Sequence, residues 1–417
     1  MKKILVVTMI ALFSICVSAW ASAPAPTPPG RQTSGFGSTA NEICSTYTSG
    51  TFGSITDGTM TYYFIPSVLK NGTTAPVIIH LHGAMLIGPE IYWSYIKHLI
   101  YQGYIVIHPQ FNKGYTGVLS DTNQYDMISR AVAGVNQALS IVGAKADTSK
   151  IYLWGHSTGG LIALCWEAAG GPAAYKKILA NPNTDPNANA SALQPSITAL
   201  DFRTMAPATT CPVILMAGNT DTIAPLSQQC DAFSALTNSP SKVVYLLQED
   251  TYGDADLLAN HMASTTDTGI VPAFIMNIIG GKGVEDAVDY RYYWAAMDAA
   301  LAGNNRATFD MGKWSDGRSV LPVKTIIDSA VTAVTVCKDA NYAGYTVQLP
   351  VGTYTLAQLQ AFGIVNDDIS SVKVPAGRTV TMYKDDNFAG TSKVFTANQA
   401  DFATIGFNDV VSSIKVQ

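Results

Sequence analysis

The stretch that most constrains the fold covers residues 150–164, KIYLWGHSTGGLIAL. A short run of large and β-branched residues ends at Trp154, a Gly-x-Ser-x-Gly pattern follows, and a run of small, helix-compatible residues comes next. This order predicts a strand, a sharp turn and a helix, with Ser157 in the turn. Such a turn holds the serine in strained backbone angles and presents its hydroxyl at the end of the strand, beside the N–H of Thr158. The surrounding strand and helix favour a catalytic serine over an ordinary glycine turn with a solvated serine.

A nucleophilic serine needs a histidine base, and the base needs a carboxylate that orients it. For a serine on this kind of turn, the partners follow in the order Asp or Glu, then His. Of six histidines, His261 alone follows Ser157, so it is the predicted base; a surface-loop histidine is the alternative. Nine carboxylates lie between the two. Asp221 is the predicted acid because it follows the end of a strand, with Glu249 and Asp250 as the fallback and a helix N-cap as its alternative role.

The oxyanion of an ester intermediate needs two N–H donors. We expect one from Thr158 and the other from the loop after the first apolar strand, with Ala84 preferred and Gly83 second. His80 and His82 are two residues apart and share a face of that strand. A metal pair is disfavoured because no third ligand is evident nearby, and we expect His82 to pack or hydrogen-bond beneath the loop.

Apolar strands and amphipathic helices alternate over the first 300 residues, whereas residues 167–210 look loop-rich. This alternation predicts an α/β fold, with a mostly parallel central sheet and helices on both faces. We expect edge strands over 50–63. The expected buried strands are 75–84, 104–109, 150–154, 211–218 and 242–247, and the expected helices are 92–102, 126–142 and 290–301.

The first residues indicate secretion. Two lysines, an apolar run over 4–17 and a small-x-small site ending at Ala21 predict a signal peptide over residues 1–21. A lipid anchor on Cys16 is disfavoured because a large isoleucine precedes it, and no other stretch is long enough to span a bilayer, so we expect no stable membrane anchor. Residues 22–44 contain a proline-rich run and are predicted to form a mobile tether.

The amino-acid composition limits the kinds of partner that the protein is expected to bind. Only 13% of residues are charged and the net charge is −5, with no basic patch, which argues against nucleic acid as a partner. Five cysteines remain after signal cleavage, none at metal-ligand spacing. In an oxidising compartment Cys211 and Cys230 are the candidate disulfide, although the sequence leaves the pairing open.

From residue 330 the sequence pattern changes to short segments typical of β-strands, and it contains an internal repeat. KDANYAG at 338–344 recurs as KDDNFAG at 384–390, and NDDISS at 366–371 recurs as NDVVSS at 408–413. A repeat of this kind predicts two copies of one small β motif.

The GHSTGG run at 155–160 and the DTIAP run at 221–225 resemble the secreted polyester hydrolase, lipase and cutinase branch of the α/β-hydrolases. The resemblance covers about residues 45–303 and implies the α/β-hydrolase fold. It departs from the family at two positions, where an aromatic residue and a methionine are usual in place of an alanine and a threonine. The implied roles are nucleophile Ser157, acid Asp221, base His261, and oxyanion donors Ala84 and Thr158.

The repeated C-terminal motifs resemble a βγ-crystallin domain, a small all-β unit of two Greek keys. Asn-Asp-x-x-Ser-Ser is that family's calcium-binding signature, and calcium takes oxygen ligands from carboxylates, hydroxyls and carbonyls. The alternative is that these side chains only cap loops. The predicted side-chain ligands are Asp367, Ser370, Asp409 and Ser412.

We therefore predict a secreted serine carboxylic-ester hydrolase that acts through an acyl-enzyme on an acyl ester, lipid or polyester. Catalysis needs no cofactor, and calcium belongs to the C-terminal domain. A peptidase or amidase with the same triad, and a non-catalytic calcium-binding surface or stress protein, are the alternatives. The predicted organisation is signal peptide 1–21, tether 22–44, hydrolase domain 45–303, linker 304–329 and crystallin-like domain 330–417.

Overall fold

A nine-stranded sheet forms the centre of the larger unit, in the order β1-β2-β4-β3-β5-β6-β7-β8-β9. The computed structural model describes residues 24–114, 121–188, 196–266, 269, 280–328, 333–350, 352–375 and 378–417, so the predicted signal peptide lies outside the described residues. The strands are β1 (Tyr47–Phe52), β2 (Thr61–Pro66), β3 (Ala75–Leu81), β4 (Ile105–Pro109), β5 (Ala146–His156), β6 (Lys176–Ala180), β7 (Val213–Gly218), β8 (Lys242–Leu247) and β9 (Lys324–Asp328). The six neighbouring strands β4, β3, β5, β6, β7 and β8 pair in parallel, whereas the pairs β1–β2, β2–β4 and β8–β9 are antiparallel. The sheet is mostly parallel, as predicted.

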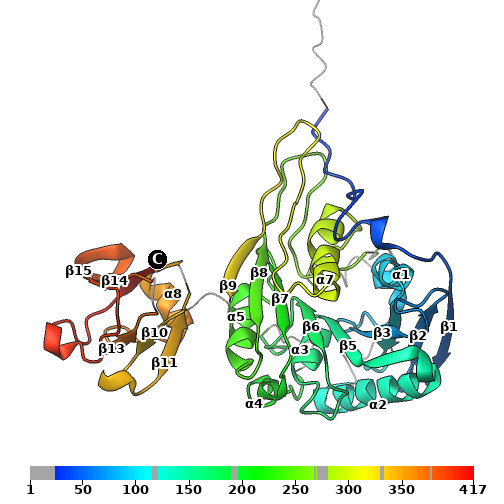
Figure 1. Ribbon diagram of the computed structural model, residues 1–417, viewed down its shortest axis with the longest axis horizontal. Coiled ribbons are helices and arrows are strands. Elements are labelled where there is room, and N and C mark those ends of the chain that lie inside the picture. Colours follow the sequence, from blue (N-terminus) through cyan, green and yellow to red (C-terminus); the bar gives the residue numbers. More distant parts are fainter. Residues whose placement is uncertain are drawn as a thin grey trace, which may run out of the picture.

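Both faces of this sheet are covered, which explains its continuous apolar strands. Every residue of β3 is buried, and successive side chains enter opposite cores: Ile78 lies in one hydrophobic cluster and Ile79 in the other. Helices α1 (Trp93–Tyr101) and α7 (Trp294–Leu301) pack on the first face. The second face holds α2 (Gln124–Val142), α3 (Thr158–Leu164) and α5 (Leu226–Ala235), as Figure 1 shows. No helix in the described ranges is both long and apolar enough to cross a membrane.

Strand β6 lies within the region predicted to be loop-rich, so that prediction was wrong. Two lysines at the start of the strand hid its apolar character. The ammonium group of Lys176 donates to the carbonyl of Ala300 at 2.8 Å, and that of Lys177 donates to the hydroxyl of Thr209 at 2.7 Å. Because both charged ends find partners, the strand is buried along its whole length.

The predicted linker, residues 304–329, belongs largely to the larger unit instead. Strand β9 pairs antiparallel with β8 at the edge of the sheet. Trp314 is 1% exposed, and its indole N–H donates to the carboxylate of Asp250 at 3.2 Å. A few apolar anchors within a polar, glycine-containing stretch hold this segment, and the unit extends to Asp328.

The tether was also predicted wrongly, because its described part is bound to the larger unit. The N–H of Gly37 donates to the buried carboxylate of Asp298 at 2.7 Å. The guanidinium of Arg31 lies 2.8 Å from Nδ1 of His98 and 4.9 Å from the centre of the Trp294 ring. Cation–π contact and charge-assisted hydrogen bonds therefore hold a segment whose proline content predicted mobility.

The C-terminal unit is a separate body of short antiparallel strands, as predicted (Figure 1). Its two sheets have the orders β11-β10-β13 and β12-β16-β14-β15 around a hydrophobic core of their own. One short helix, α8 (Leu356–Ala361), lies among the strands. The strands are β10 (Val334–Cys337), β11 (Thr346–Leu349), β12 (Gly352–Tyr354), β13 (Ser371–Lys373), β14 (Val380–Asp385), β15 (Ala389–Phe395) and β16 (Ser413–Val416).

The five cysteines in the described ranges are free thiols, so the candidate pair Cys211 and Cys230 is not bridged in this structure. Burial raises the pKa of each of these two thiols to about 11. Neither is appreciably ionised near neutral pH, and neither is a reactive thiolate.

Candidate active site

Ser157 occupies the predicted sharp turn between β5 and α3. Its backbone has φ 55° and ψ −120°, a conformation that is costly for a residue with a side chain. Close packing explains the flanking glycines. A Cβ on Gly155 would lie 2.6 Å from the carbonyl oxygen of Gly159, and a Cβ on Gly159 would lie 2.2 Å from that of Leu81. The turn is therefore wedged against the end of β3, and this contact holds the strained serine in place.

Ser157, His261 and Asp221 form one hydrogen-bonded chain. Nε2 of His261 lies 2.8 Å from the hydroxyl of Ser157, and Nδ1 of His261 lies 2.8 Å from Oδ2 of Asp221. All three are buried, with 6%, 3% and 5% of their surface exposed. Because a carboxylate only accepts, Nδ1 carries the proton and Nε2 faces the serine as an acceptor. This is the arrangement a nucleophile, base and orienting acid require.

Both carboxylate oxygens of Asp221 accept hydrogen bonds from the surrounding N–H groups. Its Oδ1 accepts the N–H groups of Ile223 and Ala224, each at 2.8 Å, in the turn that leads into α5. Burial alone would raise the pKa of this carboxyl, but His261 and the hydrogen bonds outweigh it and lower the pKa. Asp221 therefore shapes this turn and faces the histidine. It is not the helix N-cap that was its alternative role, because Pro225 occupies that position.

The fallback acids face elsewhere. Glu249 accepts the hydroxyl of Thr220 at 2.8 Å. Asp250 accepts the indole of Trp314 and the N–H of Leu321, at 3.2 and 3.0 Å. These carboxylates stabilise neighbouring loops, which leaves Asp221 as the acid beside the histidine.

Two positions that the sequence did not single out complete the acid's surroundings. The side-chain amide of Asn181 donates to Oδ2 of Asp221 at 2.6 Å, the same oxygen that faces His261. The hydroxyl of Tyr293 donates to the amide oxygen of Asn181 at 3.0 Å and so fixes which way the amide points. Asn181 directly follows β6, and because that strand was not predicted, the residue was not singled out.

The expected oxyanion donors lie in the loop after β3 and at the start of α3. The N–H of Gly83 donates to the hydroxyl of Tyr92 at 2.9 Å, which removes it as an oxyanion donor and leaves Ala84 as the candidate. Thr158 opens α3 immediately after the serine, where the first N–H groups of a helix lack helical partners. As predicted, His82 hydrogen-bonds beneath the loop, through Nδ1 to the carbonyl of Gly83 at 2.7 Å.

The histidines near the loop are packed within the core. His80 and His108 meet through their Nδ1 atoms at 2.9 Å, and both rings are fully buried. Within the described residues, no three His, Cys, Asp or Glu side chains gather as a metal site would need. Burial lowers the pKa of each ring, to about 4 for His108, so the two are neutral at physiological pH.

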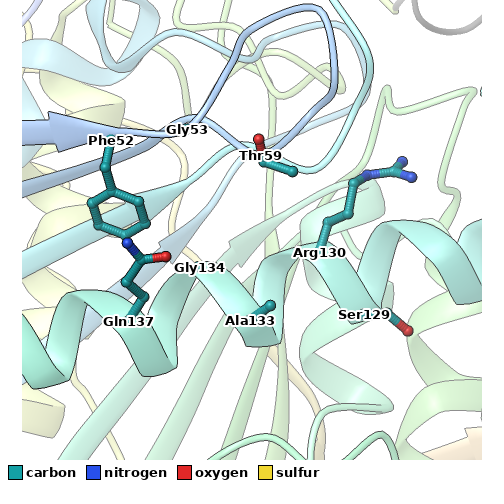
Figure 2. A pocket seen from close by; sticks show the side chains of 8 residues that line it. All are labelled: Phe52, Gly53, Thr59, Ser129, Arg130, Ala133, Gly134 and Gln137. Carbon is teal, nitrogen blue, oxygen red and sulfur yellow. The ribbon is translucent and has the colours of Figure 1, made fainter.

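A cavity of about 550 Å³ lies between α2 and the loop after β1, away from the serine. Figure 2 shows Phe52 and Gln137 facing each other at one end and Arg130 at the other. The guanidinium of Arg130 is committed to the carbonyl of Phe111 and to Asp121. This cavity therefore offers no free cationic group and no contact with the triad.

The predicted calcium ligands meet across the two repeated motifs. The hydroxyl of Ser370 donates to Asp409 at 2.9 Å, and that of Ser412 donates to Asp367 at 3.3 Å. The two aspartates share a left-handed backbone, with φ of 51° and 55°. Each site thus combines a carboxylate from one motif with a hydroxyl from the other, oxygen donors of the kind calcium prefers.

The serine that follows each of these hydroxyls has a different task. Ser413 donates to the carbonyl of Asp385 at 2.7 Å and accepts the N–H of Phe388 at 2.9 Å. Ser371 makes the same pair of bonds in the first repeat, to Asp339 and Tyr342. In each motif, therefore, the first serine is a candidate calcium ligand, and the second holds the backbone together through its hydrogen bonds.

Residues 63–270 match the chlorophyllase family. This match supports a hydrolase of the α/β-hydrolase type in that part of the chain, in agreement with the observed sheet. It supports ester hydrolysis in general and leaves the narrower polyester hydrolase and cutinase resemblance as a prediction.

The chain also has βγ-crystallin-like relatives. A part of 83 residues, 20% of the chain, is 45% identical to development-specific protein S of Myxococcus xanthus and 40% identical to its homolog. The chain spans about half the length of these curated relatives, 47% and 46%. Solved βγ-crystallin domains from Flavobacterium johnsoniae and Clostridium beijerinckii are 44% and 43% identical. They cover 20% of this chain and 93% and 95% of their own, with TM-scores of 0.20.

Proposed function

We propose that the protein is a secreted serine carboxylic-ester hydrolase with a calcium-binding accessory domain. The observation that carries the enzymatic part is the hydrogen-bonded chain from Ser157 through His261 to Asp221, with both contacts at 2.8 Å. The match of residues 63–270 to the chlorophyllase family supports an ester as substrate.

In the proposed reaction, Nε2 of His261 takes the proton of Ser157 while the serine oxygen attacks the ester carbonyl. The negative charge on the tetrahedral carbonyl oxygen is stabilised by the N–H groups of Ala84 and Thr158. The imidazolium returns the proton to the leaving alcohol, which departs and leaves an acyl-serine. Water, deprotonated by the same nitrogen, releases the acid and regenerates the serine. Asp221 stays ionised throughout and stabilises the imidazolium.

A short-chain p-nitrophenyl ester tests this proposal. We expect turnover by the wild-type protein and a loss of at least about 10⁴-fold in kcat for Ser157→Ala, with an unchanged circular dichroism spectrum. A p-nitroanilide of the same acid separates esterase from amidase, and a suspended polyester film tests the polymer-directed prediction. Ester turnover that is the same in wild type and Ser157→Ala would refute the enzymatic proposal and favour the non-catalytic alternative.

We infer that the βγ-crystallin-like match falls on the C-terminal unit, because that unit carries the repeated motifs. The proposed calcium ligands are Asp367, Ser370, Asp409 and Ser412, and their pairing across the two motifs supports this assignment. Secretion is proposed from the N-terminal sequence, and N-terminal sequencing of the exported protein tests it, with Ser22 as the expected first residue.

A further inference from the structure

A buried hydrogen-bond chain runs beneath the oxyanion loop and reaches the triad histidine from behind. The N–H of Gly83 donates to the hydroxyl of Tyr92 at 2.9 Å, and this hydroxyl lies 2.8 Å from Nδ1 of His156. Nε2 of His156 lies 2.8 Å from the backbone carbonyl oxygen of His261. The side chains of Tyr92 and His156 are both fully buried. This series of hydrogen bonds therefore connects the loop after β3, through Tyr92 at the start of α1 and His156 before the serine turn, to the backbone of the base.

The partners determine the direction of every bond in this chain. The carbonyl of His261 only accepts, so Nε2 of His156 carries the proton and Nδ1 is an acceptor. The hydroxyl of Tyr92 therefore donates to Nδ1, and its oxygen accepts the N–H of Gly83. Burial lowers the pKa of His156 to about 3 and raises the pKa of Tyr92, so both groups remain neutral and the pattern persists at working pH.

The carbonyl group of the same glycine is held by a second histidine. The carbonyl of Gly83 accepts Nδ1–H of His82 at 2.7 Å and the N–H of Leu86 at 3.0 Å. This carbonyl belongs to the peptide unit that carries the N–H of Ala84. Because a trans peptide is planar, with C=O and N–H pointing in opposite directions, fixing the carbonyl aims the N–H. Phe111, stacked on the His82 ring at 3.8 Å, holds that ring in turn.

We propose that Tyr92 and His156 are positioning residues that couple the oxyanion loop to the backbone of the triad base. Neither side chain reaches the reacting atoms, and both act through Gly83 and His261. A Cβ on Gly83 would lie 2.9 Å from Nδ1 of His156, so the close approach depends on glycine at that position. The inference rests on the proposed esterase function, since it assigns a role within that reaction.

Tyr92→Phe tests the coupling because it removes one oxygen atom and conserves the ring. Without that oxygen, the N–H of Gly83 and Nδ1 of His156 lose their partner and the loop is free to shift. Misplacement of a catalytic group by about 1 Å costs up to 10²-fold, so we expect kcat to fall about 10- to 100-fold with KM changed less than about threefold. The inhibition constant of phenylboronic acid, whose serine adduct is tetrahedral, is expected to weaken in parallel with kcat/KM.

Tyr95→Phe is the matched control. Tyr95 lies on α1, is 1% exposed, and has a buried hydroxyl without a hydrogen-bond partner in the described structure. It loses the same atom from the same side of the sheet, and we expect wild-type kinetics. If both variants lose activity alike, or if Tyr92→Phe keeps wild-type kcat and boronate affinity, the positioning role is refuted.

His156 supplies an independent test through rescue. Gln places an acceptor and a donor on one side chain, whereas Leu has neither, so His156→Gln is expected to retain several-fold more kcat than His156→Leu. A double variant of Tyr92→Phe and His156→Leu is expected to be no worse than the poorer single variant, because both break one chain. Additive losses would overturn the coupling. Absence of Ser157-dependent turnover in the wild type would instead refute the proposed function itself, and the wild-type assay separates the two failures.

Discussion

Asn181 donates its side-chain amide to Oδ2 of Asp221 across 2.6 Å, the oxygen that also faces Nδ1 of His261. Two donors therefore converge on one carboxylate oxygen, while its partner oxygen accepts two backbone N–H groups. A carboxylate with four donors has no freedom to rotate. The orientation of the histidine is consequently set by the end of β6 as well as by the turn after β7.

Removing this amide is expected to weaken the reaction. Asn181 has φ 50°, which glycine adopts without strain, so Asn181→Gly deletes the amide and leaves the backbone in place. A hydrogen bond to a charged group contributes about 1.5–3 kcal/mol, so we expect kcat/KM to fall roughly 10- to 100-fold. Asn387→Gly, at φ 54° in the C-terminal unit, is the matched control with no expected effect on the ester assay. Equal kinetics in the two variants would contradict the role of the amide.

The same substitution has a pH signature. In the folded protein the pKa of Asp221 is lowered, since His261 and the hydrogen bonds outweigh the effect of burial. Such a carboxyl stabilises the fold above its unfolded pKa of about 3.9, and that stability is lost as the pH falls through the lower folded pKa. Asn181→Gly raises the folded pKa, so acid unfolding is expected to begin at a higher pH than in the wild type. Acid titration followed by tryptophan fluorescence measures the shift, and an unshifted midpoint would count against it.

The strands and helices beside the triad could be predicted because burial on both faces demands long apolar runs, as in β3 and β7. The serine turn was likewise readable from local pattern, since a strand, glycines and a helix follow one another in the chain. Asn181 could not be predicted, because it follows a strand whose two lysine ammonium groups are hydrogen-bonded to acceptors distant in sequence. The roles of Trp314 and Arg31 could not be predicted for a similar reason: each holds a polar, glycine- or proline-containing segment through contacts with residues distant in sequence. The local sequence pattern predicts helices and strands, whereas contacts between residues distant in sequence determine which loops are held against the rest of the protein.

Gly159 is expected to tolerate no side chain. A Cβ there would lie 2.2 Å from the backbone oxygen of Leu81 and 2.5 Å from that of His82, and backbone atoms cannot swing aside as the end of a flexible side chain can. Overpacking of this kind typically costs about 1–3 kcal/mol, so Gly159→Ala is expected to lower the free energy of unfolding and to displace the serine. Gly30→Ala meets nothing within 4 Å and is the control. Urea unfolding and the ester assay on both variants test this, and wild-type values for Gly159→Ala would contradict the wedged turn.

His108 is expected to contribute to the pH dependence of stability. Its Nε2 donates to the carbonyl of Ile87 at 3.1 Å, so Nδ1 accepts a hydrogen bond from Nδ1–H of His80, which requires the His108 ring to be neutral. Burial lowers the folded pKa of His108 to about 4, against about 6.5 in the unfolded chain. The stability is thus fully present above pH 6.5 and is lost progressively as the pH falls toward 4.

Replacing the His108 ring isolates its contribution to the pH dependence of stability. One such group changes the free energy of unfolding by at most about 1.4 kcal/mol per pH unit. His108→Gln is expected to destabilise the protein at pH 7.5 and to flatten the decline between pH 6 and 5 by up to that amount. Urea denaturation at several pH values provides the slopes. Parallel curves for variant and wild type would show that His108 does not titrate as described.

The two neighbouring serines of the second C-terminal motif are expected to separate calcium binding from folding. Ser412 faces Asp367 of the other motif, so Ser412→Ala is expected to weaken calcium affinity while the calcium-free protein keeps its stability. Ser413 bridges Asp385 and Phe388, so Ser413→Ala is expected to cost about 1–2 kcal/mol without calcium and to leave the affinity of the folded protein unchanged. Isothermal titration calorimetry gives the affinities and calcium-free thermal melting gives the stabilities.

Thermal melting in saturating calcium provides a second test. A ligand at 100 times its Kd adds about 2.7 kcal/mol to the stability of the folded state. Calcium should therefore raise the melting temperature of Ser413→Ala as much as that of the wild type, but raise that of Ser412→Ala less. The reverse assignment of the two serines, or no calcium effect on either, would contradict the paired-motif site.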